Sequence, residues 1–198
     1  MNKDKWIKFD GKWIWGLLFS GMAIFSLPAK ADDGVSEKSV RDLDRLIGIW
    51  RFSDTATEHA GHEYREEGIM RCSYVLDDRY IACMSEGNNG KSTRHYIHYW
   101  SYNDITDRYE MTGLFGNYGA KENFTVTISE NGQEIELIRE PSFNRNSITT
   151  KIWGIIKFES HDHFVWEVRL NRSDQSPDHW PLSYLSQYER ARISEAEK

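Results

Sequence analysis

The sequence lacks most of the features that would assign a function at once. Lys and Arg are outnumbered, 25 against 31 Asp and Glu, for a formal charge of −6. A protein that binds the phosphate backbone needs a basic surface, and no basic stripe occurs, so we expect no nucleic acid partner. Nucleophile elbows, phosphate loops and dinucleotide fingerprints are absent as well. Internal repeats and low-complexity tracts are also missing.

Long apolar runs are missing too. The apolar, uncharged run at residues 13–27 has 15 residues, whereas a membrane-spanning helix needs roughly 20. Four lysines precede this run, and Ala29-Lys30-Ala31 follows it with small residues at the two positions that a signal peptidase reads. We interpret residues 1–31 as a secretory signal peptide cleaved before Asp32, with an uncleaved anchor as the alternative. The mature protein is then periplasmic or secreted, without a stable membrane span.

Removal of residues 1–31 leaves a chain of single-domain size. The 198 residues become 167, and the loss of five Lys and two Asp leaves 20 basic against 29 acidic side chains, a charge of −9. This length fits one domain. We divide it into a lead with a short helix, residues 32–47, and one domain, residues 48–198.

The chain has only two cysteines, Cys72 and Cys83. In an oxidising compartment such a pair indicates a disulfide before it indicates a redox or metal site. Residues 64–75 and 79–85 have the composition of two strands joined around Asp77-Asp78. A turn centred there places the two cysteines directly opposite each other, close enough for a bridge. Two buried free thiols are the alternative.

From residue 48 onward the hydrophobic pattern has a period of two. Asn131-Gly132 is typical of a hairpin turn, and the flanking alternation would pair Ile128 with Ile135 and Val126 with Leu137. A loop at residues 159–163 would pair Phe158 with Phe164 and Ile156 with Trp166. Nine or ten strands follow one another with short turns and no long helix. Because closure hides the edge strands, we predict an all-β fold: a single antiparallel up-and-down β-barrel with a short N-terminal helix.

The segment Leu43-Asp44-Arg45-Leu46-Ile47-Gly48-Ile49-Trp50 resembles the start of calycin (lipocalin-like) barrels, where Gly-x-Trp opens the first strand after a helical turn. The chain also resembles bacterial secreted lipocalin-like domains of unknown function through residues 76–81 and the aromatic strand that follows. The resemblance implies that Gly48 and Trp50 are structural, with Trp50 at the closed barrel end beneath Arg190 or Arg192. It implies ligand binding only loosely, since these relatives share a fold more than an activity.

The most aromatic segment, residues 94–102, is the main candidate for a binding surface. On a strand, His95 and Tyr99 lie on one face, while Tyr96, His98 and Trp100 lie on the other. Either face could line an apolar cavity with a few polar groups, or serve as core and aromatic exterior. The complete set of candidate ligand-binding residues is His95, Tyr99, Trp153, Trp166, Tyr64 and His98.

Metal and catalytic sites are weaker candidates. His161 and His163 on one loop could hold a metal or contact haem iron, but neither they nor residues 58–63 have the spacing of a known zinc motif. Surface histidines are the commoner case, and we expect neither a metal nor a cofactor. The run Arg65-Glu66-Glu67 could place a carboxylate inside the barrel as a general base, or lie on a solvated exterior strand.

The sequence therefore predicts an exported protein that binds a small apolar or lipid-like molecule in a barrel cavity. One alternative is an enzyme for a small hydrophobic substrate or peroxide, which requires a titratable pair at hydrogen-bond distance in the cavity. Another is an envelope interaction module with an exposed apolar patch. The sequence leaves open the ligand, the oligomeric state and the strand faces that point inward.

Overall fold

The computed structural model describes residues 38–57, 63–116, 121–143, 149–171, 176 and 179–192. The expected signal peptide and the first six residues of the expected lead, 32–37, lie outside the described residues. So do residues 58–62, which hold part of one candidate metal segment. Among the residues that are described, no helix has both the length and the apolar character needed to cross a membrane.

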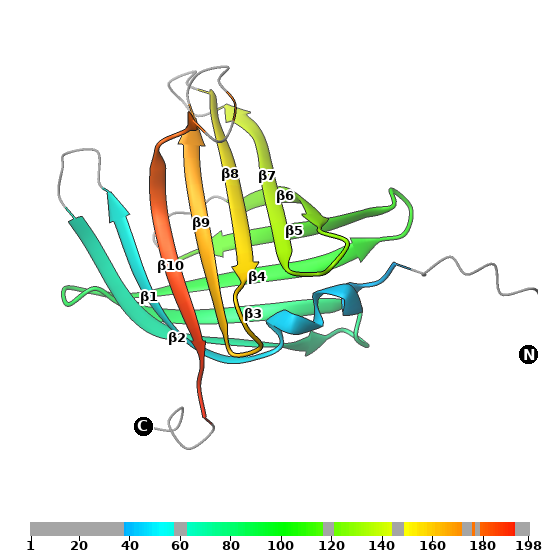
Figure 1. Cartoon of the computed structure of the whole chain (residues 1–198), viewed down its shortest axis with the longest axis horizontal. Coiled ribbons are helices and arrows are strands. Elements are labelled where there is room, and N and C mark those ends of the chain that lie inside the picture. The colour runs from blue at the N-terminus through cyan, green and yellow to red at the C-terminus, as the bar shows by residue number, and fades with distance from the viewer. Residues whose placement is uncertain are drawn as a thin grey trace, which may run out of the picture. The chain divides into compact units, whose positions relative to one another are not determined.

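Ten antiparallel strands form one closed barrel, in which each strand pairs with the next and the last with the first (Figure 1). This confirms the predicted fold class. The strands are β1 (Gly48–Thr57), β2 (Glu63–Val75), β3 (Tyr80–Asn88), β4 (Thr93–Asn103), β5 (Arg108–Phe115), β6 (Lys121–Ile128), β7 (Glu134–Phe143), β8 (Thr149–Phe158), β9 (His163–Asn171) and β10 (Leu182–Arg190).

A short helix, the 3-10 helix η1 (Val40–Leu46), precedes β1. Ser39 caps it in a capping box, because its side chain accepts from the Arg41 N–H while the Asp42 carboxylate accepts from the Ser39 N–H. The three apolar side chains of η1 that are buried are Val40, Leu43 and Leu46. They join the core cluster of the barrel, so the helix covers the end at which β1 begins.

The cross-strand pairs expected from the sequence are confirmed, namely Cys72–Cys83, Ile128–Ile135, Val126–Leu137, Phe158–Phe164 and Ile156–Trp166. The two cysteines form a disulfide. The turn before β3 contains Asp77 and Asp78 with φ of 56° and 60°, and Gly132 has φ of 65°. Asp and Gly tolerate this left-handed region better than other residues, which is why these turns fix the register.

The barrel end next to η1 is packed around Trp50, which is fully buried. The guanidinium carbon of Arg190 lies 4.2 Å from the centroid of the Trp50 ring, and its Nη1 donates to the carbonyl of Ile47 at 2.9 Å. Gly48 has φ of 139°, and a Cβ there would overlap Arg190. The structure thus places Arg190, and not the exposed Arg192, against the tryptophan.

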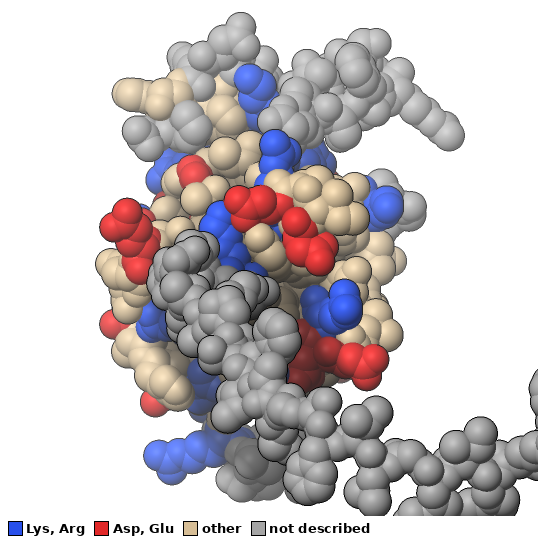
Figure 2. Space-filling model, turned by 90° about the vertical axis from the view of Figure 1, so that its right-hand side faces the viewer, with Lys and Arg blue, Asp and Glu red and all other residues tan. Residues whose placement is uncertain are grey.

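Ion pairs connect η1, and Lys38 two residues before it, to neighbouring turns. Arg41 bonds Asp78 at 2.9 Å, and Lys38 bonds Asp107 at 3.0 Å. On the face that Figure 2 shows, acidic and basic side chains are intermixed. The pairs are exposed, so each is worth at most about 1 kcal/mol, and the buried apolar cluster provides most of the stability of this end.

Candidate functional site

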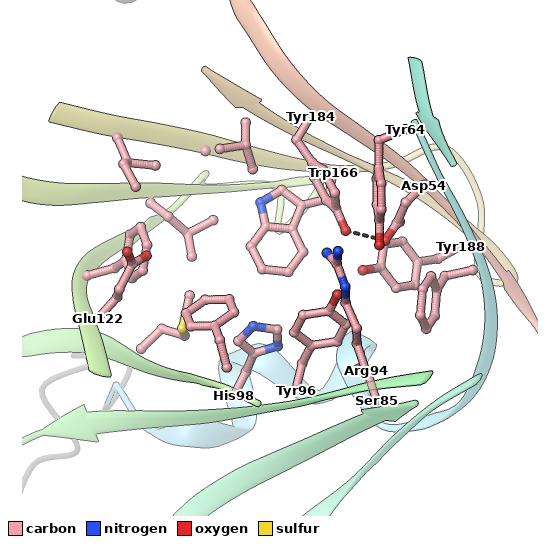
Figure 3. A pocket seen from close by; sticks show the side chains of 18 residues that line it. Asp54, Tyr64, Ser85, Arg94, Tyr96, His98, Glu122, Trp166, Tyr184 and Tyr188 are labelled. Atoms are coloured by element: carbon pink, nitrogen blue, oxygen red, sulfur yellow. Dashed lines mark hydrogen bonds between the residues drawn. The ribbon is translucent and has the colours of Figure 1, made fainter. Parts of the chain in front are cut away.

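A cavity of about 280 Å³ lies inside the half of the barrel away from η1. Each of the ten strands contributes at least one lining side chain, from the end of β1 (Asp54) round to the beginning of β10 (Tyr184). The walls are mainly aromatic and aliphatic, with a few polar groups among them (Figure 3). This composition is typical of small-molecule sites in proteins.

The alternation of strand side chains carries polar residues into this half of the barrel. On β1, Trp50 points inward, and two steps of two residues lead to Phe52 and then Asp54. On β2, steps of two residues from the inward Cys72 pass Met70 and Gly68 and then reach Glu66 and Tyr64. All of these side chains except Tyr64 are buried, as the period of a pleated strand requires.

Three of the candidate ligand-binding residues come together in the cavity, namely Tyr64, His98 and Trp166. The other three lie on the outer face. The side chain of His95 is 68% exposed and Tyr99 is 36% exposed. The indole Nε1 of Trp153 donates to Glu136 at 2.5 Å.

The register between β3 and β4 explains which face of the aromatic strand points inward. His98 lies directly opposite Cys83, whose side chain faces the interior as part of the disulfide. Arg94, Tyr96 and His98 therefore share the inner face.

Two acidic side chains, Asp54 and Glu66, are buried inside the barrel, each 1% exposed. They lie directly opposite each other on β1 and β2. Asp54 accepts a hydrogen bond from the hydroxyl of Tyr184, and Glu66 accepts from Tyr64 and, at 2.9 Å, from Tyr96. Glu66 packs over Gly87, where a Cβ would overlap the carboxylate. The sequence had left open whether Glu66 faces inward or outward, and the structure places it inside.

The environment of these groups shifts their protonation equilibria. Burial raises the pKa of Asp54 to about 7, against the opposing effect of the hydrogen bond from Tyr184, and the charge of Glu66 adds to the increase. Burial, with the Glu66 carboxylate, raises the pKa of Tyr96 to about 12 and that of Tyr64 further. The hydroxyls consequently stay protonated as donors at neutral pH.

His98 is buried between aromatic rings, 7% exposed, with ring centroids 5.9 Å from Phe115 and 5.4 Å from Trp166. Burial lowers the pKa of His98 to about 4, so the imidazole is neutral at pH 7. Within the part of the chain that the structure describes, His98 Nδ1 and Trp166 Nε1 have no hydrogen-bond partner. Unsatisfied buried polar atoms are uncommon in folded proteins.

Other charged side chains reach the cavity. The guanidinium of Arg94 lies 4.7 Å from the centroid of the Tyr64 ring. On the opposite wall Glu122 forms an ion pair with Arg139. Asp54, Arg94, Glu122 and Tyr184 are lining residues that the sequence analysis did not select. Alternation counted from Trp50 and from Arg190 would have found Asp54 and Tyr184.

The loop histidines do not converge on a common point. Nδ1 of His161 lies 2.8 Å from Asp162, whereas Nδ1 of His163 lies 3.0 Å from Glu159. Among the described residues, no three His, Cys, Asp or Glu side chains are grouped so that they could hold a metal ion.

An apolar row crosses the outer face of three neighbouring strands. Met84 pairs with Ile97, and Ile97 pairs with Leu114. Met84 is 52% exposed and Leu114 is 36% exposed. This row is the feature that an interaction module would use.

Comparison with known proteins identifies the fold and nothing finer. No protein-family model matches the chain, and no curated protein matches it in sequence. Rv2717c from M. tuberculosis is similar in structure, with a TM-score of 0.58 and 12% identity over 77% of this chain and 97% of that one. The S-type phycobiliprotein lyase CPES from Guillardia theta has a TM-score of 0.51 and 16% identity over 79% of this chain and 94% of that one. The chain therefore has a calycin-like barrel fold, which is consistent with binding a small ligand.

Proposed function

We propose that this barrel binds one small, mostly apolar molecule that carries a polar group. The observation that supports this is the cavity of about 280 Å³, just below the roughly 300–1,000 Å³ of most ligand pockets. Its aromatic walls provide apolar contact, while Asp54, His98 and Trp166 present polar atoms that lack partners among the described residues. A ligand with one polar group would satisfy some of them.

We also propose that the protein works outside the cytoplasm, in the periplasm or as a secreted protein. The basic and apolar start of the chain supports this proposal. The Cys72–Cys83 disulfide is consistent with an oxidising compartment.

Mass spectrometry of the purified protein tests the binding function. Under non-denaturing conditions, we expect a population heavier than the bare chain by the mass of one small organic molecule, and organic extraction should release that molecule. A bare mass, together with no one-to-one binding of any small aromatic or aliphatic probe, would contradict the proposal.

A second candidate is an enzyme that transfers a proton to or from a bound substrate. The observation in its favour is the pair Asp54–Tyr184, two titratable groups in hydrogen-bond contact at the cavity, of which Asp54 has a pKa of about 7. Catalytic acids and bases are often tuned to this range. Incubation of the extracted molecule with wild-type protein and with Asp54→Asn separates the two functions, since a binding protein returns the molecule unchanged in both cases.

A further inference from the structure

Two carboxylates lie next to each other in the cavity half of the barrel, and the basic side chain near them is Arg94. Asp54 and Glu66 are opposite one another in register and almost fully buried. In the described part of the chain, their side-chain hydrogen bonds come from tyrosine hydroxyls, which are neutral donors. Buried charges in proteins are normally paired with opposite charges. The site therefore has an excess of negative charge whenever both groups are ionised.

Asp54 is the carboxylate with an acceptor to spare. Both oxygens of Glu66 accept hydrogen bonds from Tyr96, at 3.1 and 2.9 Å, and Tyr64 donates to one of them. On Asp54, Oδ2 accepts from Tyr184, whereas Oδ1 has no partner at full hydrogen-bond geometry among the described residues. The Ser186 hydroxyl, opposite Asp54 on β10, is its polar neighbour and partly offsets the rise in the Asp54 pKa. The Asp54 side chain also lines the cavity, which Glu66 does not.

Aromatic rings surround this carboxylate. Tyr64, Tyr184 and Tyr188 approach Asp54 in Figure 3, with the indole of Trp166 across the cavity. Ring faces attract cations, and one cation already uses such a face, because the guanidinium of Arg94 lies over Tyr64. A carboxylate within an aromatic enclosure is a suitable environment for a positively charged nitrogen.

We propose that the polar group of the ligand is a cationic nitrogen, an ammonium or amidinium, which lies against Asp54 among the tyrosine rings. This inference rests on the proposed binding function and names the class of ligand. Glu66 acts behind the tyrosines as a second negative charge and positions Tyr64 and Tyr96. The apolar part of the ligand lies against Trp166 and Phe124 in the remaining cavity.

Arg94 is the group that an anionic ligand would use instead. A carboxylate or phosphate ligand would pair with this one guanidinium but would bring a further negative charge next to Asp54 and Glu66. Like charges at such short range in a buried site are strongly unfavourable. The charge balance of the cavity therefore favours a cation.

Three probes with the same aromatic body test the inference by isothermal titration calorimetry at pH 8. They are 2-phenylethylamine, 2-phenylethanol and 3-phenylpropanoate, which end in a cation, a neutral hydroxyl and an anion. We expect the amine to bind at least about tenfold more tightly than the alcohol, and the carboxylate to bind most weakly.

Variants assign the effect to Asp54. Asp54→Asn should reduce the advantage of the amine over the alcohol to less than about threefold, because the neutral amide removes the charge-assisted contact. Glu66→Gln should reduce it partly. Glu67→Gln is the matched control, since Glu67 is the exposed neighbour on the same strand and should leave the ratio unchanged. The alcohol reports whether each variant keeps an intact cavity.

The pH dependence provides an independent measurement. Asp54 faces Glu66 on β2, Tyr184 and Tyr188 on β10, and the inner face of β4 with Arg94 and Tyr96. Its pKa of about 7 means that the ionised fraction rises roughly tenfold between pH 6 and pH 8. The amine affinity should rise by a similar factor, while the alcohol affinity stays constant.

The outcomes separate this inference from the binding function. If the alcohol or the carboxylate binds as tightly as the amine, or if Asp54→Asn keeps the amine preference, the cationic ligand is excluded and the binding function stands. If none of the probes binds and the purified protein carries no small molecule, both proposals fail.

Discussion

Replacement of Asp54 by Asn is expected to change how the stability of the barrel depends on pH. Burial raises the pKa of Asp54 from 3.8 to about 7 in the folded protein. Between these values the folded state holds a proton that the unfolded state releases, so stability falls as pH rises. From pH 5 to pH 8 the loss from this group amounts to roughly 2–3 kcal/mol.

His98 opposes this trend. Burial lowers its pKa from 6.5 to about 4, so the unfolded state takes up a proton that the folded state excludes, and stability rises with pH between these values. The gain from pH 5 to pH 8 is about 2 kcal/mol. These two contributions nearly cancel in the wild-type protein, and the Asn variant should show the gain from His98 alone.

Urea unfolding at pH 5, 6, 7 and 8 measures the difference. The stability of Asp54→Asn relative to wild type should increase by roughly 2–3 kcal/mol over this range, which corresponds to about 5–10 °C in melting temperature. His98→Asn should change the slope in the opposite direction. Parallel pH profiles for wild type and Asp54→Asn would refute the claim that Asp54 is buried and protonated at pH 5.

Three further substitutions test the structure and the cavity. Arg190→Met removes the hydrogen bond to Ile47 and the contact with Trp50. It should lower the free energy of unfolding by about 2–3 kcal/mol, as measured by chemical denaturation. Arg192→Met is the control, and an equal loss of stability in both variants would contradict the role of Arg190. The double variant Cys72→Ser, Cys83→Ser should lower the free energy of unfolding by about 3 kcal/mol, because the disulfide closes a short loop and so restricts the unfolded chain. Reduction of the disulfide in the wild-type protein should lower it by a similar amount. Gly154→Leu should abolish binding of every probe at a stability cost of about 1–3 kcal/mol, because even a Cβ at this position would lie 3.0 Å from Trp166 Nε1. Thr125→Leu on the outer face is the control. Unchanged probe affinity in Gly154→Leu would place the ligand elsewhere.

The fold could be predicted because its main determinants are local in sequence. The turns at Asp77-Asp78 and Asn131-Gly132 fix hairpin register, and a period of two then pairs every residue beyond them. Cys72 and Cys83 are opposite each other for this reason alone. Closure of the barrel followed from the number of strands and the absence of long helices.

The site could be predicted only in part because the phase of β4 depends on a neighbouring strand. A strand with aromatic residues on both faces carries no internal signal for its inner face, so His95 and Tyr99 appeared as suitable as His98. The pairing of Cys83 with His98 resolves this, and it is a contact between strands. Asp54 and Glu66 were harder to recognise, because an acidic residue in an alternating pattern normally indicates the solvated face.

The most direct test of the account is a crystal structure of the protein grown with the probe that binds it most tightly. The account predicts electron density for one molecule inside the barrel, between Asp54 and Trp166, with its polar end toward Asp54. An interior filled by side chains, or a probe bound only on the outer face, would contradict it.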